Sequence, residues 1–230
     1  MEVERVVQRI IGKSDFKLSK DVPFSYILRK AQKFIIGKFR GSFRKIGMKF
    51  CGKGFFVGKN VKLLSKKKLS LGNHVRIDDN VSIDALSTFG METGDRVKIG
   101  ENSKIICSGS LSSLGKGLKI GNDTSFGENA FFGAAGGIKI GNDVIAGQNV
   151  RFHAENHNFE NKSILIRLQG VKRKGIKVGS NVWIGAGAVF LDGSEVGDGC
   201  IVAAGSIVTK KFGNDIVIGG IPAKEIRKRV

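Results

Sequence analysis

A six-residue repeat governs most of this 230-residue chain. From Val57 onward an apolar residue recurs every six positions and is usually followed by Gly or Asp. The run at 178, 184, 190, 196, 202 and 208 keeps this period without a slip. Such a period predicts an all-β solenoid of short parallel strands, in which each apolar residue points inward and stacks on its equivalents in neighbouring coils. The 33 glycines suit the tight corners of such coils, whereas the 2 prolines exclude a Pro-rich disordered chain.

The repeat is interrupted once at length, between Val150 and Val178. We predict that a loop at about 153–177 is extruded there. This segment carries His153 and His157, two of the three histidines in the chain. An imidazole with a pKa of about 6.5 suits proton transfer near neutral pH, so the interruption favours a catalytic site. Shorter slips at 85–96 and 106–118 predict small loops.

The N-terminal part, residues 1–54, is predicted to be a helical extension. Apolar residues recur at helical spacing from Phe24 to Phe43, and a short helix is also expected near Val3–Ile11. Between Pro23 and Phe50 there are eight Lys or Arg residues and no Asp or Glu. A basic amphipathic helix is typical of a membrane surface, but a helix that packs on its own domain is an equal alternative.

The formal net charge of +19 indicates an anionic partner. Nucleic acid ranks last, because the repeat shows no basic-aromatic platform and no known binding motif. The three cysteines are scattered, which fits a reduced cytosolic setting better than a disulfide framework or a zinc site. No signal-peptide pattern and no apolar run of about 20 residues is present, so neither export nor a membrane-spanning helix is expected.

Five motifs in order carry a resemblance to a known family: Glu155-Asn156-His157-Asn158-Phe159, Gln169-Gly170, 181–186 (NVWIGA), 203–210 (AAGSIVTK) and 220–224 (GIPAK). The chain resembles the hexapeptide-repeat acyltransferases, particularly bacterial O-acetyltransferases of lipopolysaccharide, capsule and exopolysaccharide synthesis. The resemblance implies a left-handed parallel β-helix over 55–221, and 222–230 is expected to form a short basic helix that Pro222 opens. Residues 211–214 depart from the family pattern, so a different turn is expected there.

The resemblance also implies roles for individual residues. His157 is expected to act as general base in direct transfer from acetyl-CoA, and either Glu155 or a backbone carbonyl orients its ring. The candidates for the acceptor side are His153, Glu155, Asn156 and Phe159. His153 should face outward, and the favoured interpretation gives it no part in the reaction.

The donor side is implied in the same way. The backbone N–H of Ala186 would stabilise the oxyanion, that of Ala204 would meet the pantetheine arm, and Trp183 would flank the cleft. Coenzyme A phosphates would meet three basic residues: Lys210, Lys224 and Arg227. Each assignment has a structural alternative. Corner geometry would explain the small residues Ala186 and Ala204, a subunit interface would explain Trp183, and a solvated surface would explain the three basic residues. No metal is expected, because His74 precedes His153 by about four coils, too far for a three-histidine zinc site.

The favoured reading is an acetyl-CoA-dependent O-acetyltransferase. It would act on a lipid-linked or nucleotide-linked glycan, as a homotrimer with its sites between subunits, in the cytoplasm or on the inner membrane face. N-acetylation of an amino sugar and a structural β-helix scaffold stay open as alternatives.

Overall fold

The computed structural model describes residues 17–19 and 21–230. The helix expected near Val3–Ile11 lies outside these residues. The chain divides into two compact units, Met1–Ile36 and Gly37–Val230. Among the described residues, every strand lies in the second unit, which is therefore the unit that holds the predicted solenoid.

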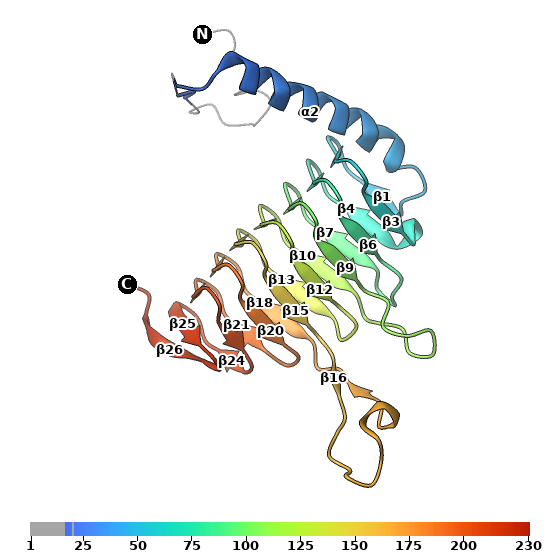
Figure 1. The fold of residues 1–230 in the computed structure, drawn as a ribbon, viewed down its shortest axis with the longest axis vertical. Helices are drawn as coiled ribbons and strands as arrows, with labels where there is room; N and C mark the ends of the chain where they lie inside the picture. Colours follow the sequence, from blue (N-terminus) through green and yellow to red (C-terminus); the bar gives the residue numbers. More distant parts are fainter. Residues whose placement is uncertain (1–16, 20) are drawn as a thin grey trace. The chain divides into compact units, whose positions relative to one another are not determined.

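The second unit is a left-handed parallel β-helix whose strands follow one another on three faces (Figure 1). Face A consists of β1 (Phe50–Cys51), β4 (Leu69–Leu71), β7 (Met91–Thr93), β10 (Leu118–Ile120), β13 (Ile138–Ile140), β18 (Ile176–Val178), β21 (Glu195–Val196) and β24 (Lys211–Phe212). Face B consists of β2 (Phe56–Val57), β5 (Arg76–Ile77), β8 (Lys98–Ile99), β11 (Ser125–Phe126), β14 (Ile145–Ala146), β19 (Trp183–Ile184), β22 (Ile201–Val202), β25 (Ile216–Gly220) and β26 (Ala223–Lys228). Face C consists of β3 (Lys62–Leu64), β6 (Ser82–Asp84), β9 (Lys104–Ile106), β12 (Phe131–Gly133), β15 (Arg151–His153), β20 (Val189–Leu191) and β23 (Ile207–Val208). A short 3₁₀ helix, η1 (Lys66–Lys68), precedes β4.

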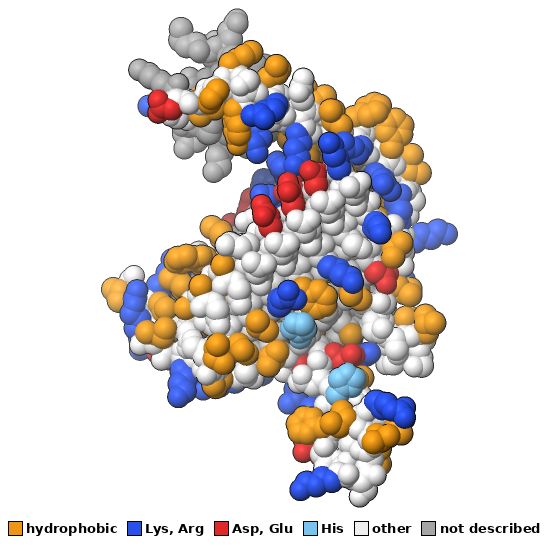
Figure 2. Space-filling model, in the orientation of Figure 1, with side chains coloured by type: hydrophobic (Ala, Val, Ile, Leu, Met, Phe, Trp, Pro, Cys, Tyr) orange, Lys and Arg blue, Asp and Glu red, His pale blue; other side chains and the backbone are white. Residues whose placement is uncertain are grey.

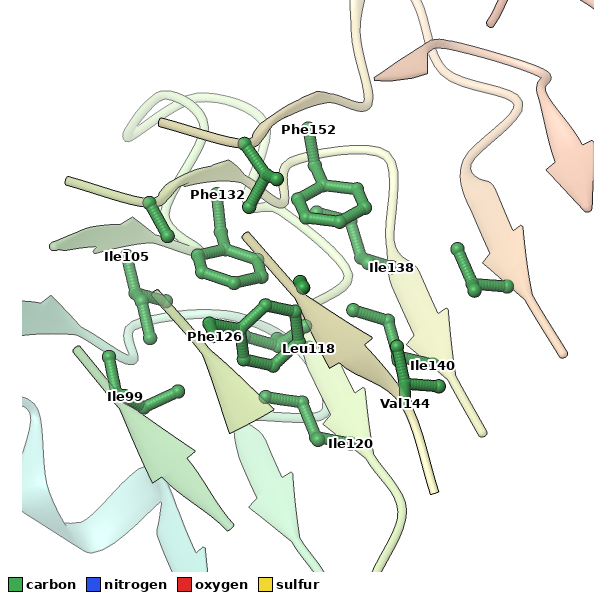
Figure 3. Close-up of a cluster of buried hydrophobic side chains, with 14 of the residues drawn as sticks. Ile99, Ile105, Leu118, Ile120, Phe126, Phe132, Ile138, Ile140, Val144 and Phe152 are labelled. Atoms are coloured by element: carbon green, nitrogen blue, oxygen red, sulfur yellow. The ribbon is translucent and has the colours of Figure 1, made fainter. Parts of the chain in front are cut away.

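The core is a set of stacks, because equivalent residues of successive coils lie in register. Phe132, Phe152 and Phe190 form one such stack on face C, with ring centroids 5.0 and 4.8 Å apart. Phe126 meets the edge of this stack from face B at 4.9 Å from Phe132 (Figure 3). Each buried ring contributes roughly 1.5–3 kcal/mol of transfer free energy. The predicted inward positions from 178 to 208 are all buried, so the six-residue interpretation is confirmed.

The corner between faces A and B is held by a ladder of side chains. The amide N–H of each corner residue is bound by an oxygen from the next coil, as in Asn142 N–H to Ser180 Oγ at 3.1 Å and Ser180 N–H to Asp198 Oδ1 at 2.6 Å. The same bond recurs from Lys53 through Asp198. Since the tight turn would otherwise leave these N–H groups without a partner, the ladder satisfies them at nearly every coil.

Helix α2 (Phe24–Arg44) confirms the predicted basic amphipathic helix. In its last turns, Gly37 and Gly41 are buried against the first coil. A Cβ atom on Gly37 would lie 2.1 Å from the ring of Phe56, and one on Gly41 would lie 2.1 Å from the carbonyl oxygen of Phe55. The alternative of a helix that packs on its own domain therefore holds for residues 37–44. No helix among the described residues is long and apolar enough to cross a membrane.

The helix predicted at 222–230 is wrong. Ala223–Lys228 instead forms β26, antiparallel to β25. An isolated helix of nine residues is marginal in water, whereas a strand satisfies the open edge of β25. The turn expected at 211–214 is also only partly right, because Lys211 and Phe212 form β24 and extend face A by one more strand.

Candidate active site

The predicted loop leaves the repeat at the corner between faces C and A, after β15 (Figure 1). Its two arms pair as β16 (Asn156–His157) and β17 (Val171–Lys172), with His157 opposite Val171. A short 3₁₀ helix, η2 (Ile166–Leu168), lies near its tip. The amide of Gln169 donates to the carbonyl oxygens of Asn161 and Ile164, at 2.8 and 2.7 Å, and so ties the loop to itself. This frame holds the His157 side chain exposed to solvent.

The base of the loop is anchored by Arg173. Its Nε lies 2.5 Å from Oε2 of Glu155, on the opposite arm, and its Nη1 donates to Ser113 and Leu114 on a neighbouring loop. Asp192 accepts hydrogen bonds from the backbone N–H groups of Lys174 and Gly175, where the loop rejoins the repeat. Glu155 therefore positions the loop through Arg173. The group that orients the His157 ring, either Glu155 or a backbone carbonyl, stays a prediction.

Sequence patterns did not point to Arg173 or Asp192. Arg173 lies in a basic run, 172–174, where nothing distinguishes it from its lysine neighbours. Asp192 directly follows a strand of the repeat, a position that does not indicate burial. In the folded structure, its side chain is buried, with an exposed fraction of 7%.

His153 lies on the outer side of β15 and faces outward, as predicted, directly after the buried Phe152. Its ring is tilted over Phe131 with the centroids 5.2 Å apart. Burial of the imidazole, assisted by the charge of Arg151, holds the pKa of His153 below its ordinary value. A neutral, half-buried ring of this kind can line an acceptor surface.

The other acceptor-side candidates lie on the extruded loop with His157. Asn156 precedes His157 in β16, and the Phe159 ring is exposed with Lys172 Nζ 5.7 Å from its centroid. These residues flank His157 on the same segment of chain. The loop therefore presents the His157 imidazole among polar, apolar and cationic side chains.

Ala186 and Ala204 occupy equivalent positions at the corner between faces B and C. Each is the second residue of a tight turn, since Ala188 N–H reaches the Gly185 carbonyl and Ser206 N–H reaches the Ala203 carbonyl. The third residue is Gly187 or Gly205, with φ near +70°. Within residues 21–230, neither alanine N–H has an acceptor, because no side chain caps this end of the corner. Two backbone donors therefore face outward one coil apart.

Small residues here also have a structural reason, as the corner-geometry alternative holds. A Cβ atom on Gly185 would lie 2.4 Å from the backbone nitrogen of Ala204 in the next coil. Trp183 precedes this corner on face B and is 57% exposed.

The expected phosphate-binding residues are not all together. Lys224 and Arg227 are exposed on β26, in the same sheet as Trp183. Lys210 lies between β23 and β24, at the opposite corner, with its Nζ 5.4 Å from the ring of Phe212. Among the residues that the structure describes, no three His, Cys, Asp or Glu side chains are placed to hold a metal ion.

The candidate site residues on the loop and those at the amide corner lie in two separate regions of the β-helix. The loop of His157 leaves the corner between faces C and A, whereas the amides of Ala186 and Ala204 lie at the corner between faces B and C. Face C separates the two regions within one chain.

Comparison with known proteins agrees with this class. Residues 175–210 match the family model "Bacterial transferase hexapeptide (six repeats)". These residues carry the hexapeptide repeat, and the predicted resemblance to the hexapeptide-repeat acyltransferases is confirmed.

Two curated relatives illustrate the similarity. Over 113 residues the chain is 37% identical to a chloramphenicol acetyltransferase of Agrobacterium fabrum, covering 49% of this chain and 52% of the relative. Over 53 residues it is 43% identical to the galactoside O-acetyltransferase of Escherichia coli K12, covering 23% and 26%. The chain spans about half the length of the first relatives that it matches.

The fold is also that of a solved enzyme. AntD, an N-acyltransferase from Bacillus cereus in complex with dTDP and 3-hydroxybutyryl-CoA, superposes with a TM-score of 0.57 at 20% identity. The match covers 83% of this chain and 88% of AntD.

Proposed function

We propose that this chain is an acetyl-CoA-dependent O-acetyltransferase that acts on a sugar hydroxyl in bacterial surface polysaccharide synthesis. The observation that carries the proposal is the pair of uncapped amides at Ala186 and Ala204, beside the exposed Trp183. Outward donors one coil apart suit the carbonyl groups of a thioester and of the pantetheine arm. Relatives named as acetyltransferases and a neighbour solved with an acyl-CoA support the donor.

In the proposed reaction, His157 removes the proton of the acceptor hydroxyl as its oxygen attacks the acetyl carbonyl carbon. The carbonyl oxygen becomes an oxyanion that the Ala186 N–H stabilises, while the Ala204 N–H holds the pantetheine arm. Collapse breaks the carbon–sulfur bond, and the proton on His157 passes to the leaving thiolate. Lys224 and Arg227, on the same sheet, are cations for the coenzyme A phosphates.

We propose a homotrimer in which the loop of one subunit reaches the amide corner of the next. Face B supports this, because Ile145, Trp183, Ile201 and Val217 form a continuous apolar ladder on its outer side. Ile145 is 62% exposed. Exposed apolar ladders of this kind mark interfaces between proteins. Closure on a neighbour would also bring the two separated regions together.

We also propose that helix α2 attaches the enzyme to the anionic inner face of the cytoplasmic membrane. Figure 2 shows Lys and Arg side chains alternating with hydrophobic ones along α2. Phe39 and Phe43, on the same helix as the buried Gly37 and Gly41, are 66% and 58% exposed. Packing thus leaves part of the apolar stripe free for a headgroup boundary. A lipid-linked acceptor would be reached there.

The N-acetylation alternative is favoured by one observation, the likeness to AntD, an N-acyltransferase solved with a dTDP-linked amino sugar. An amine acceptor would use the same base and the same amides. Assays with hydroxyl and amino acceptors of one sugar separate the two.

The test of the enzyme is His157→Ala. We expect kcat to fall by about 10²–10⁴, the usual contribution of a general base, with unchanged acetyl-CoA affinity by calorimetry. His153→Ala is the matched control and should cost far less. Equal losses in the two variants, or none for His157→Ala, would refute the assignment.

A further inference from the structure

A basic groove of about 830 Å³ runs along face A and the corner between faces C and A. Seven lysines and two glutamates contribute to its walls, so its charged lining is strongly positive. The proposed acetyl transfer uses none of these side chains. A concave, cationic surface of this size therefore lacks an assigned ligand.

One wall of the groove is a row of outward-facing residues in strict register. The parallel pairing places Lys119, Lys139 and Lys177 directly above one another on β10, β13 and β18. Parallel strands lie ~4.8 Å apart, so the Cα atoms of the three lysines repeat at about that interval. Lys119 approaches Glu92 at 3.9 Å and Lys177 approaches Glu195 at 3.6 Å, whereas Lys139, between them, has no acidic partner within residues 21–230.

The other wall is built at the corner. The floor of the groove beside this wall is formed by Gly117, Gly137 and Gly175, which occupy equivalent corner positions with positive φ. Because glycine has no side chain, nothing projects from these positions into the groove. The stem of Lys116 lies 3.3 Å from where a Cβ on Gly137 would be, and that of Lys174 lies 3.0 Å from the corresponding position on Gly193. Lysines therefore border the floor on both sides.

Face A differs from face B in a way that keeps the groove accessible. The outer row of face B is apolar over Ile145, Trp183 and Ile201, whereas that of face A is charged over the equivalent coils. A neighbouring subunit on face B would remove apolar surface from water, which is favourable. A neighbouring subunit on face A would have to desolvate the charged lysines, which is unfavourable. Face B is thus the more favourable surface for the proposed trimer contact, which leaves the lysine row exposed.

We propose that this groove binds a linear anionic glycan, with carboxylate or phosphate groups along it, and that this glycan is the acceptor. The proposal rests on the proposed function. A row of cations along one face suits a repeating polyanion better than a single ion. Phe89 is the only aromatic residue in the lining, so the groove lacks the stacking platform that single-stranded nucleic acid requires. Lys174, in the wall, adjoins Arg173, which anchors the loop of His157, so the bound chain leads toward the catalytic loop.

The test measures binding to the full-length protein by fluorescence anisotropy, with a labelled oligogalacturonate as the probe. The variant combines Lys119→Gln, Lys139→Gln and Lys177→Gln. The matched control combines Lys62→Gln, Lys67→Gln and Lys104→Gln, three exposed lysines outside the groove. We expect the groove variant to bind about tenfold more weakly, because it lacks three cations that attract the polyanion, whereas the control keeps its affinity. Binding should also weaken as salt rises.

Three results would overturn the inference. They are equal affinity of the groove variant and the wild type, equal affinity for a neutral malto-oligosaccharide, and displacement of the probe by millimolar inorganic phosphate. Binding of an oligothymidylate as tight as that of the oligogalacturonate would assign the groove to nucleic acid instead. Acetyl-CoA binding and the effect of His157→Ala are measured in parallel. If these persist while glycan binding fails, only the acceptor site is refuted; if they fail while glycan binding persists, the proposed enzyme is refuted.

Discussion

Glu155 and Arg173 join the two arms of the His157 loop through an ion pair, with Oε2 and Nε 2.5 Å apart. The Arg173 side chain is only 13% exposed, and it also donates to the carbonyl oxygens of Ser113 and Leu114. One guanidinium group therefore holds both loop arms and a second loop. Because a general base must lie within hydrogen-bond reach of its proton, we expect this anchor to affect the proposed catalysis without touching the reacting atoms.

We expect Arg173→Met to lower kcat by about 10–100-fold, because a small misplacement of a catalytic group is costly. Acetyl-CoA affinity should stay unchanged, and amide hydrogen exchange should rise over 156–172. Arg167→Met, an exposed arginine of the same loop, serves as control. Unchanged hydrogen exchange in Arg173→Met would contradict the role of the anchor.

Ala186→Pro removes one backbone N–H at a turn position that accepts proline, the second residue of a turn with positive φ at the third. We expect kcat to fall by about 10²–10³, the cost of one oxyanion donor. Glu128→Pro, at the equivalent corner of an earlier coil, is the matched control. The melting temperatures of both variants show whether the fold is kept, and equal activity of the two would count against the oxyanion role.

The lowered pKa of His153 makes stability depend on pH. The unfolded chain binds a proton at about pH 6.5, whereas the folded chain resists it, so the free energy of unfolding falls as pH drops below about 6.5. NMR titration should place the His153 pKa below 6.5, and Arg151→Ala should raise it. Denaturant unfolding of His153→Gln should lose this part of the pH dependence; an unaltered dependence would exclude His153 as its source.

Ile145→Asp places a charge in the apolar ladder of face B. We expect light scattering to give a trimer for the wild type at micromolar concentration and smaller species for the variant, since burial of an unpaired carboxylate is unfavourable. Lys139→Asp, which alters a charge on face A, should stay trimeric. A monomeric wild type would remove the basis for a site shared between subunits.

Liposome flotation tests the membrane contact of α2. The protein should bind phosphatidylglycerol vesicles at low salt, ignore phosphatidylcholine vesicles, and release as salt rises. Phe39→Ser with Phe43→Ser should weaken binding at least about tenfold, because two rings no longer enter the boundary. Phe89→Ser with Leu111→Ser removes two exposed apolar residues elsewhere and should have no effect. If the wild-type protein does not float with the vesicles, the membrane contact is refuted, and the packing of residues 37–44 on the first coil is the remaining role of α2.

The sequence by itself determined the solenoid, because the six-residue period from 178 to 208 dictates which side chains enter the core. It also located the loop of His157, since an interrupted repeat has to leave the stack. These features depend on local periodicity, which a single sequence displays directly.

Only the tertiary structure decided what depends on neighbours from other coils. Glu155 contacts Arg173, which lies 18 residues further along the chain. Lys139 lies between Lys119 and Lys177 because the strands β10, β13 and β18 pair in one register, although the segments that connect them differ in length. The C-terminal segment reads as a helix locally but pairs with the edge of β25, where unpaired backbone groups make a strand more favourable. Register between coils is set by stacking of the whole core, so no local pattern contains it.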